Sequence, residues 1–159
     1  MNKTHDYFMK QAYLEALKAY EKEEVPVGCV IVKDGIIIAR SHNLKETKQK
    51  ATAHAEISAI EKASKKLGNW RLEDCQMYVT LEPCPMCTGA IINSRIKEIY
   101  IAVEDTISGC CGTVIDLART QSFSNNNVKI EYGLMQEECS KLLKDFFKKL
   151  RKKWGFKFE

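Results

Sequence analysis

Two periods of apolar residues, one helical and one extended, mark the first third of the chain. Within residues 6–24, apolar side chains recur at steps of three and four, which predicts an amphipathic helix with Thr4 as its N-cap. Two β-branched runs follow at 27–32 and 36–39, with an Asp-Gly pair between them. Because Asp-Gly favours the tight turns that join antiparallel strands, we predict a hairpin after the first helix.

Helices and strands continue to alternate along the rest of the chain. The patterns predict, in order, a helix at 54–67, a strand at 77–81, a helix at 86–93, strands at 98–103 and 128–132, a helix at 136–153, and a polar loop at 122–127. A strand, a helix and a strand in succession pair in parallel, so the sheet combines the antiparallel hairpin with parallel strands. We therefore predict a three-layer α/β/α fold in which helices flank a five-stranded mixed sheet.

Length and composition favour one domain in a reducing compartment. With 159 residues, 45% of them hydrophobic, the chain suits a single compact domain spanning 1–159. No apolar run reaches the length of a membrane span, and the N-terminus lacks a signal-peptide segment, so we expect a cytoplasmic protein without a membrane partner. The seven cysteines are odd in number and include the adjacent pair Cys110 and Cys111, which favours reduced thiols over a disulfide framework.

Positive charge is concentrated at the C-terminal end. Residues 141–159 contain eight basic and two acidic residues, which leaves 17 basic and 19 acidic residues in the remainder of a chain whose net charge is +4. A basic terminal segment is most often a solvated helix face, and it is also typical of an element that binds phosphates. Charge alone leaves both interpretations open.

Two short motifs carry the candidate chemistry. His54-Ala55-Glu56 starts a predicted helix, and Pro83-Cys84-Pro85-Met86-Cys87 joins a predicted strand to a helix. One imidazole and two thiolates suit zinc, and helix N-termini favour thiolate over thiol. A catalytic zinc takes three protein ligands and keeps its fourth position for water. We therefore predict one Zn²⁺ per chain, held by His54, Cys84 and Cys87.

Glu56 is the predicted proton carrier of this site. Placed two residues after His54, it lies near the metal without being forced to ligate it, and it can move a proton from water to the substrate. Cys75 precedes the predicted strand and the Cys110-Cys111 pair lacks chelating spacing, which favours an open site. A different class remains as the alternative, a non-catalytic thiol or structural zinc module.

The order H-x-E and then P-C-x-x-C resembles the signature of zinc nucleobase deaminases. Among these, the chain most resembles the bacterial tRNA adenosine deaminases, over nearly its whole length. The similar segments are 24–28, 42–43, 52–56, 69–72, 78–84, 86–87 and 94–96. The resemblance implies a cytidine deaminase-like fold, a homodimer, and zinc-dependent hydrolysis of adenosine to inosine at the wobble position of a tRNA anticodon.

The resemblance also implies roles for residues outside the metal motifs. It gives Asn43 a contact to the flipped base and places Asp105 near the flanking nucleotides, with Glu104 as the alternative because the loop is one residue longer than usual. On the closing helix, Phe147 and Arg151 are implied to contact the anticodon loop of the tRNA. A deaminase of a free nucleobase or nucleoside, of the guanine or cytidine type, is the alternative within the class, and the basic terminus favours RNA.

Overall fold

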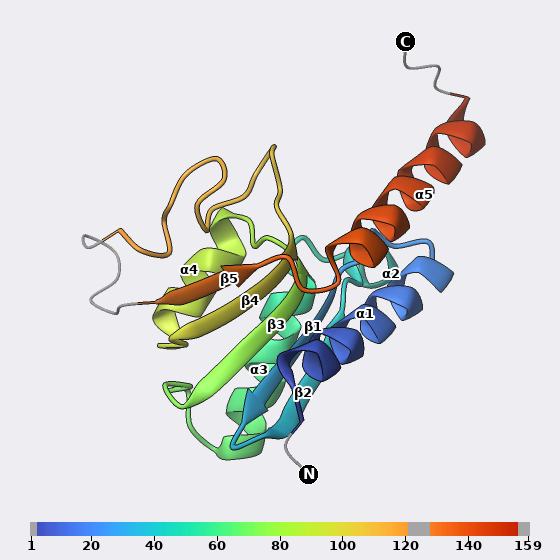
Figure 1. The fold of residues 1–159 in the computed structure, drawn as a ribbon. Helices are drawn as coiled ribbons and strands as arrows, with labels where there is room; N and C mark the ends of the chain where they lie inside the picture. The colour runs from blue at the N-terminus through green and yellow to red at the C-terminus, as the bar shows by residue number, and fades with distance from the viewer. Residues whose placement is uncertain (1–2, 121–127, 156–159) are drawn as a thin grey trace.

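The computed structural model describes residues 3–120 and 128–155 (Figure 1), so the loop predicted at 122–127 lies outside the described residues. The elements are α1 (His5–Glu21), β1 (Gly28–Lys33), β2 (Ile36–His42), α2 (Lys45–Lys48), α3 (Ala55–Leu67), β3 (Cys75–Leu81), α4 (Pro85–Asn93), β4 (Glu98–Val103), β5 (Lys129–Tyr132) and α5 (Gln136–Trp154). Among the described helices, none combines the length and the apolar character that a membrane span requires.

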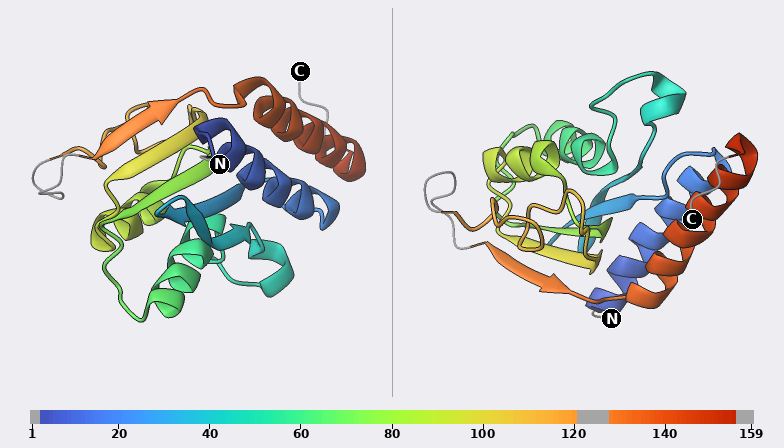
Figure 2. Two further views of the ribbon diagram at one scale, coloured as in Figure 1. Left: turned by 60° about the horizontal axis from the view of Figure 1, so that its bottom comes forward. Right: turned by 90° about the horizontal axis from the view of Figure 1, so that it is seen from above.

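The five strands form one mixed sheet in the order β2-β1-β3-β4-β5. β1 pairs antiparallel with β2 and β3, whereas the pairs β3-β4 and β4-β5 are parallel. α3 and α4 cover one face of the sheet, and α1 and α5 lie side by side on the other (Figure 2). This arrangement confirms the predicted three-layer α/β/α fold.

Strand direction brings four chain segments to one edge of the sheet. Because β1 runs antiparallel to both of its neighbours, its first residue, Gly28, pairs with His42 at the end of β2. The parallel register then pairs Leu81 with Val103, the last residues of β3 and β4. The connections before β1 and after β2, β3 and β4 therefore meet at this edge.

Each face of the sheet has its own hydrophobic core, because side chains alternate along a strand. In β3, Met77 and Val79 pack on the side of α3 and α4, and Tyr78 packs on the side of α1. There the Tyr78 ring stacks on Tyr100 of β4, with ring centroids 4.6 Å apart. Phe8 of α1 completes the contact at 5.2 Å from Tyr78.

The first helix is shorter than the apolar pattern predicts. It ends at Glu21 rather than at residue 24, and Glu23 takes a left-handed conformation with φ 60°. Glu24 turns inward and is only 1% exposed. Its carboxylate accepts hydrogen bonds from the backbone N–H groups of Glu46 (3.0 Å) and Thr47 (2.7 Å). The prediction failed here because the partners of Glu24 lie more than twenty residues away in the sequence.

One short helix and two further boundaries differ from the sequence predictions. The single-turn helix α2 was not predicted, because four polar residues carry no apolar period. β2 continues past residue 39 to His42, and Cys75 opens β3 rather than preceding it. The remaining predicted elements agree with the structure to within one residue at each end.

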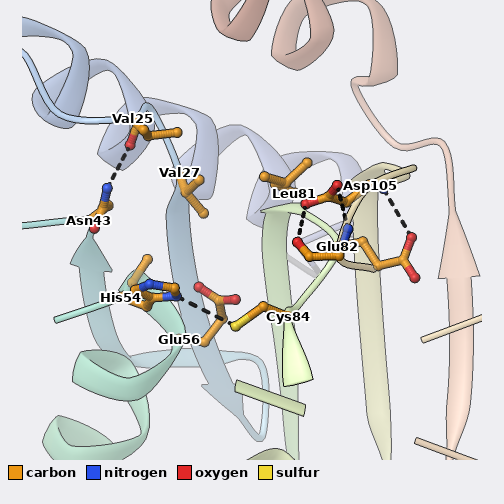
Figure 3. Close-up of a pocket in the computed structure, with 11 residues that line it drawn as sticks. Val25, Val27, Asn43, His54, Glu56, Leu81, Glu82, Cys84 and Asp105 are labelled. Atoms are coloured by element: carbon orange, nitrogen blue, oxygen red, sulfur yellow. Dashed lines mark hydrogen bonds between the residues drawn. The ribbon is translucent and has the colours of Figure 1, made fainter. Parts of the chain in front are cut away.

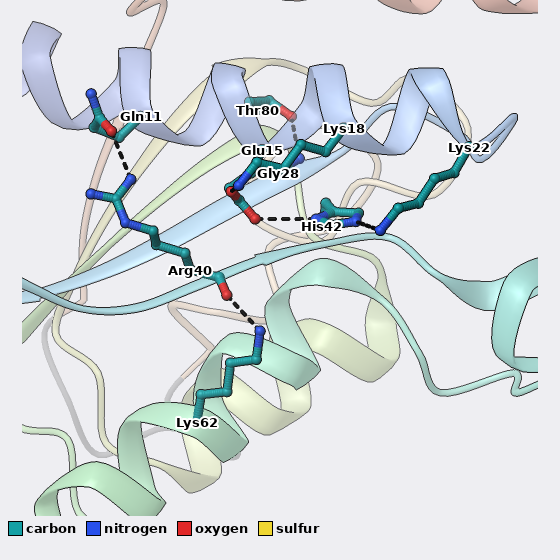
Figure 4. Close-up of polar contacts among 9 residues, drawn as sticks. All are labelled: Gln11, Glu15, Lys18, Lys22, Gly28, Arg40, His42, Lys62 and Thr80. Carbon is teal, nitrogen blue, oxygen red and sulfur yellow. Dashed lines mark hydrogen bonds and ion pairs between the residues drawn. The ribbon is translucent and has the colours of Figure 1, made fainter.

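Polar contacts join α1 to β2 and β2 to α3 (Figure 4). The His42 ring lies 3.1 Å from a carboxylate oxygen of the buried Glu15, and Arg40 donates to Gln11 at 2.6 Å. On the opposite face, the Lys62 ammonium donates to the Arg40 carbonyl at 2.8 Å. These contacts attach the edge strand β2 to both helical layers and so stabilise the segment that leads into the pocket.

Candidate active site

A pocket opens at the sheet edge where the four connections meet (Figure 3). Val25 and Val27 reach it from the segment before β1, Asn43 from the end of β2, Glu82 from the end of β3, and Asp105 from the end of β4. Its lining therefore comes from residues that are distant in the sequence. Both hydrophobic and polar side chains face the same space.

His54, Cys84 and Cys87 form a compact group at this pocket. Their potential ligand atoms all lie within 4.8 Å of one another, and the His54 Nδ1 atom is 3.7 Å from Cys84 Sγ and 3.5 Å from Cys87 Sγ. His54 is the N-cap of α3, Cys84 is the N-cap of α4, and Cys87 lies in the first turn of α4. Within residues 3–120 and 128–155, no other group of three such side chains is found.

The positions of the two sulfurs shift their pKa values in opposite directions. The Cys84 sulfur accepts a hydrogen bond from the Cys87 thiol and lies beside the His54 imidazole, which lowers the pKa of Cys84 to about 4. The pKa of Cys87 is raised, because its thiol is the donor in that pair and is buried. Of the two sulfurs, Cys84 therefore favours the thiolate, and a bound cation would favour the second thiolate at Cys87.

Glu56 is buried beside this group. It follows His54 in the first turn of α3, and its side chain is 4% exposed. Figure 3 shows the Glu56 carboxylate close to the His54 ring and the Cys84 sulfur. Burial raises the pKa of Glu56 to about 7, and the nearby Cys84 charge acts in the same direction. The carboxyl group can therefore exchange a proton near neutral pH.

Asn43 lies at the pocket with both ends of its amide engaged. The Nδ2 group donates to the carbonyl of Val25 at 3.3 Å, and Oδ1 accepts from the backbone N–H of Lys45 at 3.2 Å. Asn43 thus joins two connections that border the pocket, and its side chain is 8% exposed. Both contacts are long, so the amide is oriented without being bound tightly.

The β4 connection presents Asp105 to the pocket, together with Ser108. The Asp105 carboxylate accepts from the backbone N–H groups of Ile107 (2.9 Å) and Ser108 (3.1 Å) and from the Ser108 hydroxyl (3.0 Å). Glu104, the alternative in the sequence, is exposed and does not line the pocket. Of the two acidic residues, only Asp105 lines the pocket.

Phe147 and Arg151 lie on the exposed side of α5 and do not line the pocket. Phe147 is 40% exposed, whereas the neighbouring Phe146 is 7% exposed and packs edge-on against Tyr20. Beyond them, Lys153 pairs with Glu23 at 3.2 Å, next to the segment that enters the pocket. Any contact of Phe147 and Arg151 is thus made outside the pocket.

Sequence reasoning did not single out Val25, Val27, Glu82 or Ser108, all of which line the pocket. Two of the segments that resemble the deaminases, 24–28 and 78–84, contain the first three of them. The location of Val25 and Val27 at the pocket depends on the antiparallel placement of β1, which local patterns do not reveal.

Comparisons with known proteins place this site in a family. Residues 3–151 match the MafB19-like deaminase family. A tRNA-specific adenosine deaminase of Bacillus subtilis (strain 168) is 49% identical over 148 residues, which cover 93% of this chain and 91% of that protein. The chain belongs to the tRNA-specific adenosine deaminase family. Membership confirms the prediction of a deaminase and sets aside the non-catalytic module.

Solved structures agree with this assignment to the tRNA-specific adenosine deaminases. One, from a study of A-to-I editing by tRNA deaminases at the wobble position of transfer RNA, is 37% identical with a TM-score of 0.80, and the match covers 86% of this chain and 99% of that chain. A guanine deaminase from Bacillus subtilis is 45% identical with a TM-score of 0.63, over 65% of this chain and 67% of its own. The likeness to the tRNA deaminase confirms the predicted cytidine deaminase-like fold.

Proposed function

We propose that this protein hydrolyses the wobble adenosine of a tRNA anticodon to inosine, with release of ammonia. The observation that carries the proposal is the three-ligand group of His54, Cys84 and Cys87 beside the buried carboxyl group of Glu56. The identity to a tRNA-specific adenosine deaminase along nearly the whole chain supports the choice of substrate.

His54, Cys84 and Cys87 fit one Zn²⁺ ion. One imidazole and two sulfurs are borderline-soft donors of the kind that zinc prefers, and three ligands leave a position for solvent or substrate. The start of α4 favours the thiolate at Cys84, and a bound cation would favour it at Cys87 as well. When bound, the metal would supply Lewis acidity, which makes a water molecule a stronger nucleophile at neutral pH.

Glu56 moves the protons in the proposed reaction. Its carboxylate accepts a proton from the attacking water and delivers it to the ring nitrogen next to C6, as oxygen adds at that carbon. Glu56 then carries the remaining proton of the added hydroxyl group to the amino nitrogen, the C6–N6 bond breaks, ammonia leaves, and the carbonyl of inosine forms. A pKa near 7 suits a group that must both accept and donate.

Asn43 and Asp105 border the space in which the base is proposed to lie. The Asn43 amide offers a donor and an acceptor to the edge of a flipped purine, and Val25 and Val27 offer an apolar wall for its face. We assign Asp105 to contacts with the nucleotides beside the target. An anticodon loop already presents unstacked bases, which lowers the cost of extrusion.

The basic segment at 141–159 is proposed to hold the anticodon stem-loop. Its described part includes the exposed residues Lys148, Arg151 and Lys152 on α5, whose positive charge suits phosphate groups. The exposed ring of Phe147 suits stacking on a loop base. The outer half of α5 lies beside the end of α1, from which the chain enters the pocket.

Further parts of the proposal concern assembly and location. We place the protein in the cytoplasm as a single-domain homodimer, in keeping with a tRNA substrate and seven free thiols. Exposed apolar side chains at Ile107, Val114 and Ile115 offer surface for the second copy. Light scattering of the purified protein would give twice the chain mass if this is correct.

The test is inosine formation at the wobble position of transcribed tRNA that carries adenosine there. Purified wild-type protein with its metal content measured is expected to release ammonia from this tRNA and to hold about one zinc per chain. tRNA with guanosine at the same position is the matched control substrate. Absence of inosine from zinc-loaded protein would refute the proposal.

Free guanine in the same assay tests the alternative within the class. The guanine deaminase that shares 45% identity over part of the chain makes this comparison necessary. We expect kcat/KM for the tRNA to exceed kcat/KM for free guanine or cytidine by a factor of at least about 100. Equal rates would reverse the assignment in favour of a small-molecule deaminase.

A further inference from the structure

Glu82 is a buried carboxylate at the pocket for which the proposed reaction has no use. It follows β3 directly, and its side chain is 2% exposed. Burial of a charged group is costly unless hydrogen bonds satisfy it. Glu82 meets this requirement through donors from one segment, the loop of residues 104–113.

Four groups of this loop donate to Glu82. Its Oε1 atom accepts from the backbone N–H of Asp105 at 3.1 Å and from the Thr113 hydroxyl. Its Oε2 atom accepts from the N–H groups of Cys111 at 2.9 Å and Thr113 at 3.2 Å. Both ends of the loop are thus tied to one carboxylate, which lies between them.

The absence of a side chain at Gly109 lets the loop pack directly against Glu82. A Cβ atom at this position would lie 2.5 Å from the Glu82 Cδ atom and 2.5 Å from the carbonyl oxygen of Asp105. Contacts shorter than about 3 Å are not tolerated, so any larger residue must displace the loop or the carboxylate. The backbone N–H of Cys110 also donates to the Pro83 carbonyl at 3.0 Å.

The face of the loop toward the pocket carries Asp105 and Ser108. The Asp105 carboxylate bonds only to its own turn among the described residues, through Ile107 and Ser108. It therefore makes no contact that holds the turn against the body of the protein. The Asp105 backbone supplies an attachment at the start of the turn, through Glu82, and the Cys110 N–H supplies one after it, through the Pro83 carbonyl.

We propose that Glu82 is a positioning residue for substrate recognition, which holds loop 104–113 so that Asp105 and Ser108 border the pocket. The inference deepens the proposed function and rests on it for the identity of the RNA. Glu82 acts through the loop, and it neither ligates the metal nor touches the reacting atoms.

Glu82→Gln is the first test, because an amide keeps the size of the side chain but has one accepting oxygen and turns two donors toward backbone N–H groups. Hydrogen exchange at the amides of Asp105, Cys111 and Thr113 should accelerate by about tenfold or more. Glu61→Gln, which removes an exposed carboxylate from α3, should leave these rates unchanged. Unchanged exchange in Glu82→Gln would overturn the proposal whether or not the protein deaminates tRNA.

Kinetics on the anticodon stem-loop separate positioning from general structural support. For Glu82→Gln we expect KM to rise by about tenfold, kcat to change by less than about twofold, and zinc to stay at about one per chain. A fall in kcat at constant KM, or a loss of zinc, would show that Glu82 supports the metal ligands that follow it instead. Unchanged kinetics would also refute the proposal.

A double-mutant cycle tests whether Glu82 acts through Asp105. If it does, Glu82→Gln combined with Asp105→Ala should reduce kcat/KM no further than the more damaging single change. Independent losses that multiply would refute the link. Should Glu82→Gln fail to fold, Gly109→Ala displaces the same loop by steric overlap, and it is expected to give the same rise in KM.

Discussion

At the scale of single residues, the proposed chemistry depends on Glu56 being beside the metal ligands without being one. The carboxyl group is buried next to His54, the N-cap of α3, and its pKa is raised to about 7 by that burial. His54, a proposed ligand, and Glu56, the proposed proton carrier, thus lie at the start of one helix, which keeps their spacing rigid. Metal binding and proton transfer can then be separated by substitution.

We expect Glu56→Ala to retain about one zinc per chain and to lose turnover by a factor of about 10² to 10⁴, the usual contribution of a general acid and base. Inosine formation and metal analysis on the same preparation check both parts. Glu61→Ala, further along α3 and exposed, is the control and should keep both properties. Loss of zinc from Glu56→Ala would contradict the role assigned to it.

At the scale of elements, α1 packs against β1 so closely that only glycine fits at position 28. A Cβ atom on Gly28 would lie 1.9 Å from the Ala12 carbonyl oxygen and 2.5 Å from the Ala16 backbone nitrogen. Both neighbours are backbone atoms, so relief requires the whole helix to move. Gly28 also stands directly after Val27, which lines the pocket.

Gly28→Ala is therefore expected to lower the free energy of unfolding by about 3 kcal/mol or more. Urea unfolding followed by circular dichroism measures the change. Gly89→Ala is the matched control, because nothing lies within 4 Å of its Cβ position inside α4. There the substitution should be neutral or stabilise by up to about 1 kcal/mol. Equal behaviour of the two variants would show that α1 does not pack as described.

Glu24 holds α2 in place in the same way that Glu82 holds its loop, by accepting hydrogen bonds from backbone N–H groups. Burial raises the pKa of Glu24, but hydrogen bonds from Thr47 and Glu46 outweigh burial, and the net pKa is lowered from the usual 4.5. A carboxyl group whose pKa is lower in the folded protein stabilises the fold above its unfolded value, and this contribution disappears as the pH falls through the folded value.

Glu24→Gln should accordingly reduce the free energy of unfolding by about 1–3 kcal/mol at about pH 7. Below the unfolded pKa of 4.5, the difference between wild type and variant should shrink. Urea unfolding at about pH 7 and about pH 3.5 measures it. A difference that stays constant across this range would mean that the ionised carboxylate is not what stabilises the segment.

At the scale of the whole molecule, the basic surface and the pocket lie on different elements, which approach one another near the end of α1. The body of the protein supplies the pocket, and α5 supplies the basic surface. Lys153 pairs with Glu23, and the Lys149 ammonium lies 5.1 Å from the centre of the Tyr20 ring, so the outer half of α5 is held against the end of α1. A phosphate chain bound along α5 would reach toward the pocket.

Removal of this charge should weaken RNA binding without affecting the chemical step. We expect the triple change Lys148→Ala, Arg151→Ala and Lys152→Ala to raise the Kd for an anticodon stem-loop and to reduce the salt slope of log Kobs by about one for each phosphate that is no longer neutralised. Fluorescence anisotropy across a salt series measures both. The control is the double change Lys65→Ala and Lys66→Ala, which removes two exposed lysines from the C-terminal end of α3. An unchanged slope would exclude α5 from the interface.

Short-range spacing along the chain was sufficient to predict the local parts of this protein. His54 with Glu56, and Cys84 with Cys87, each stand at the start of one helix, so short-range spacing places their side chains before any tertiary contact exists. The apolar periods likewise predicted the helices and strands of the three-layer fold. Family resemblance added Asn43 and Asp105, both of which reach the pocket.

Contacts between segments that are distant in the sequence bring those local pieces together. The antiparallel placement of β1 carries Val25 and Val27 to the edge where β3 and β4 end. The buried carboxylates of Glu24 and Glu82 find their donors 22 to 31 residues further along the chain. Helix and strand propensities and apolar periods report on residues that are neighbours in the sequence. A buried carboxylate, in contrast, is stabilised by backbone N–H groups that come near it only when the chain folds. The residues that line the pocket beside the metal motifs could therefore not be predicted from local sequence patterns.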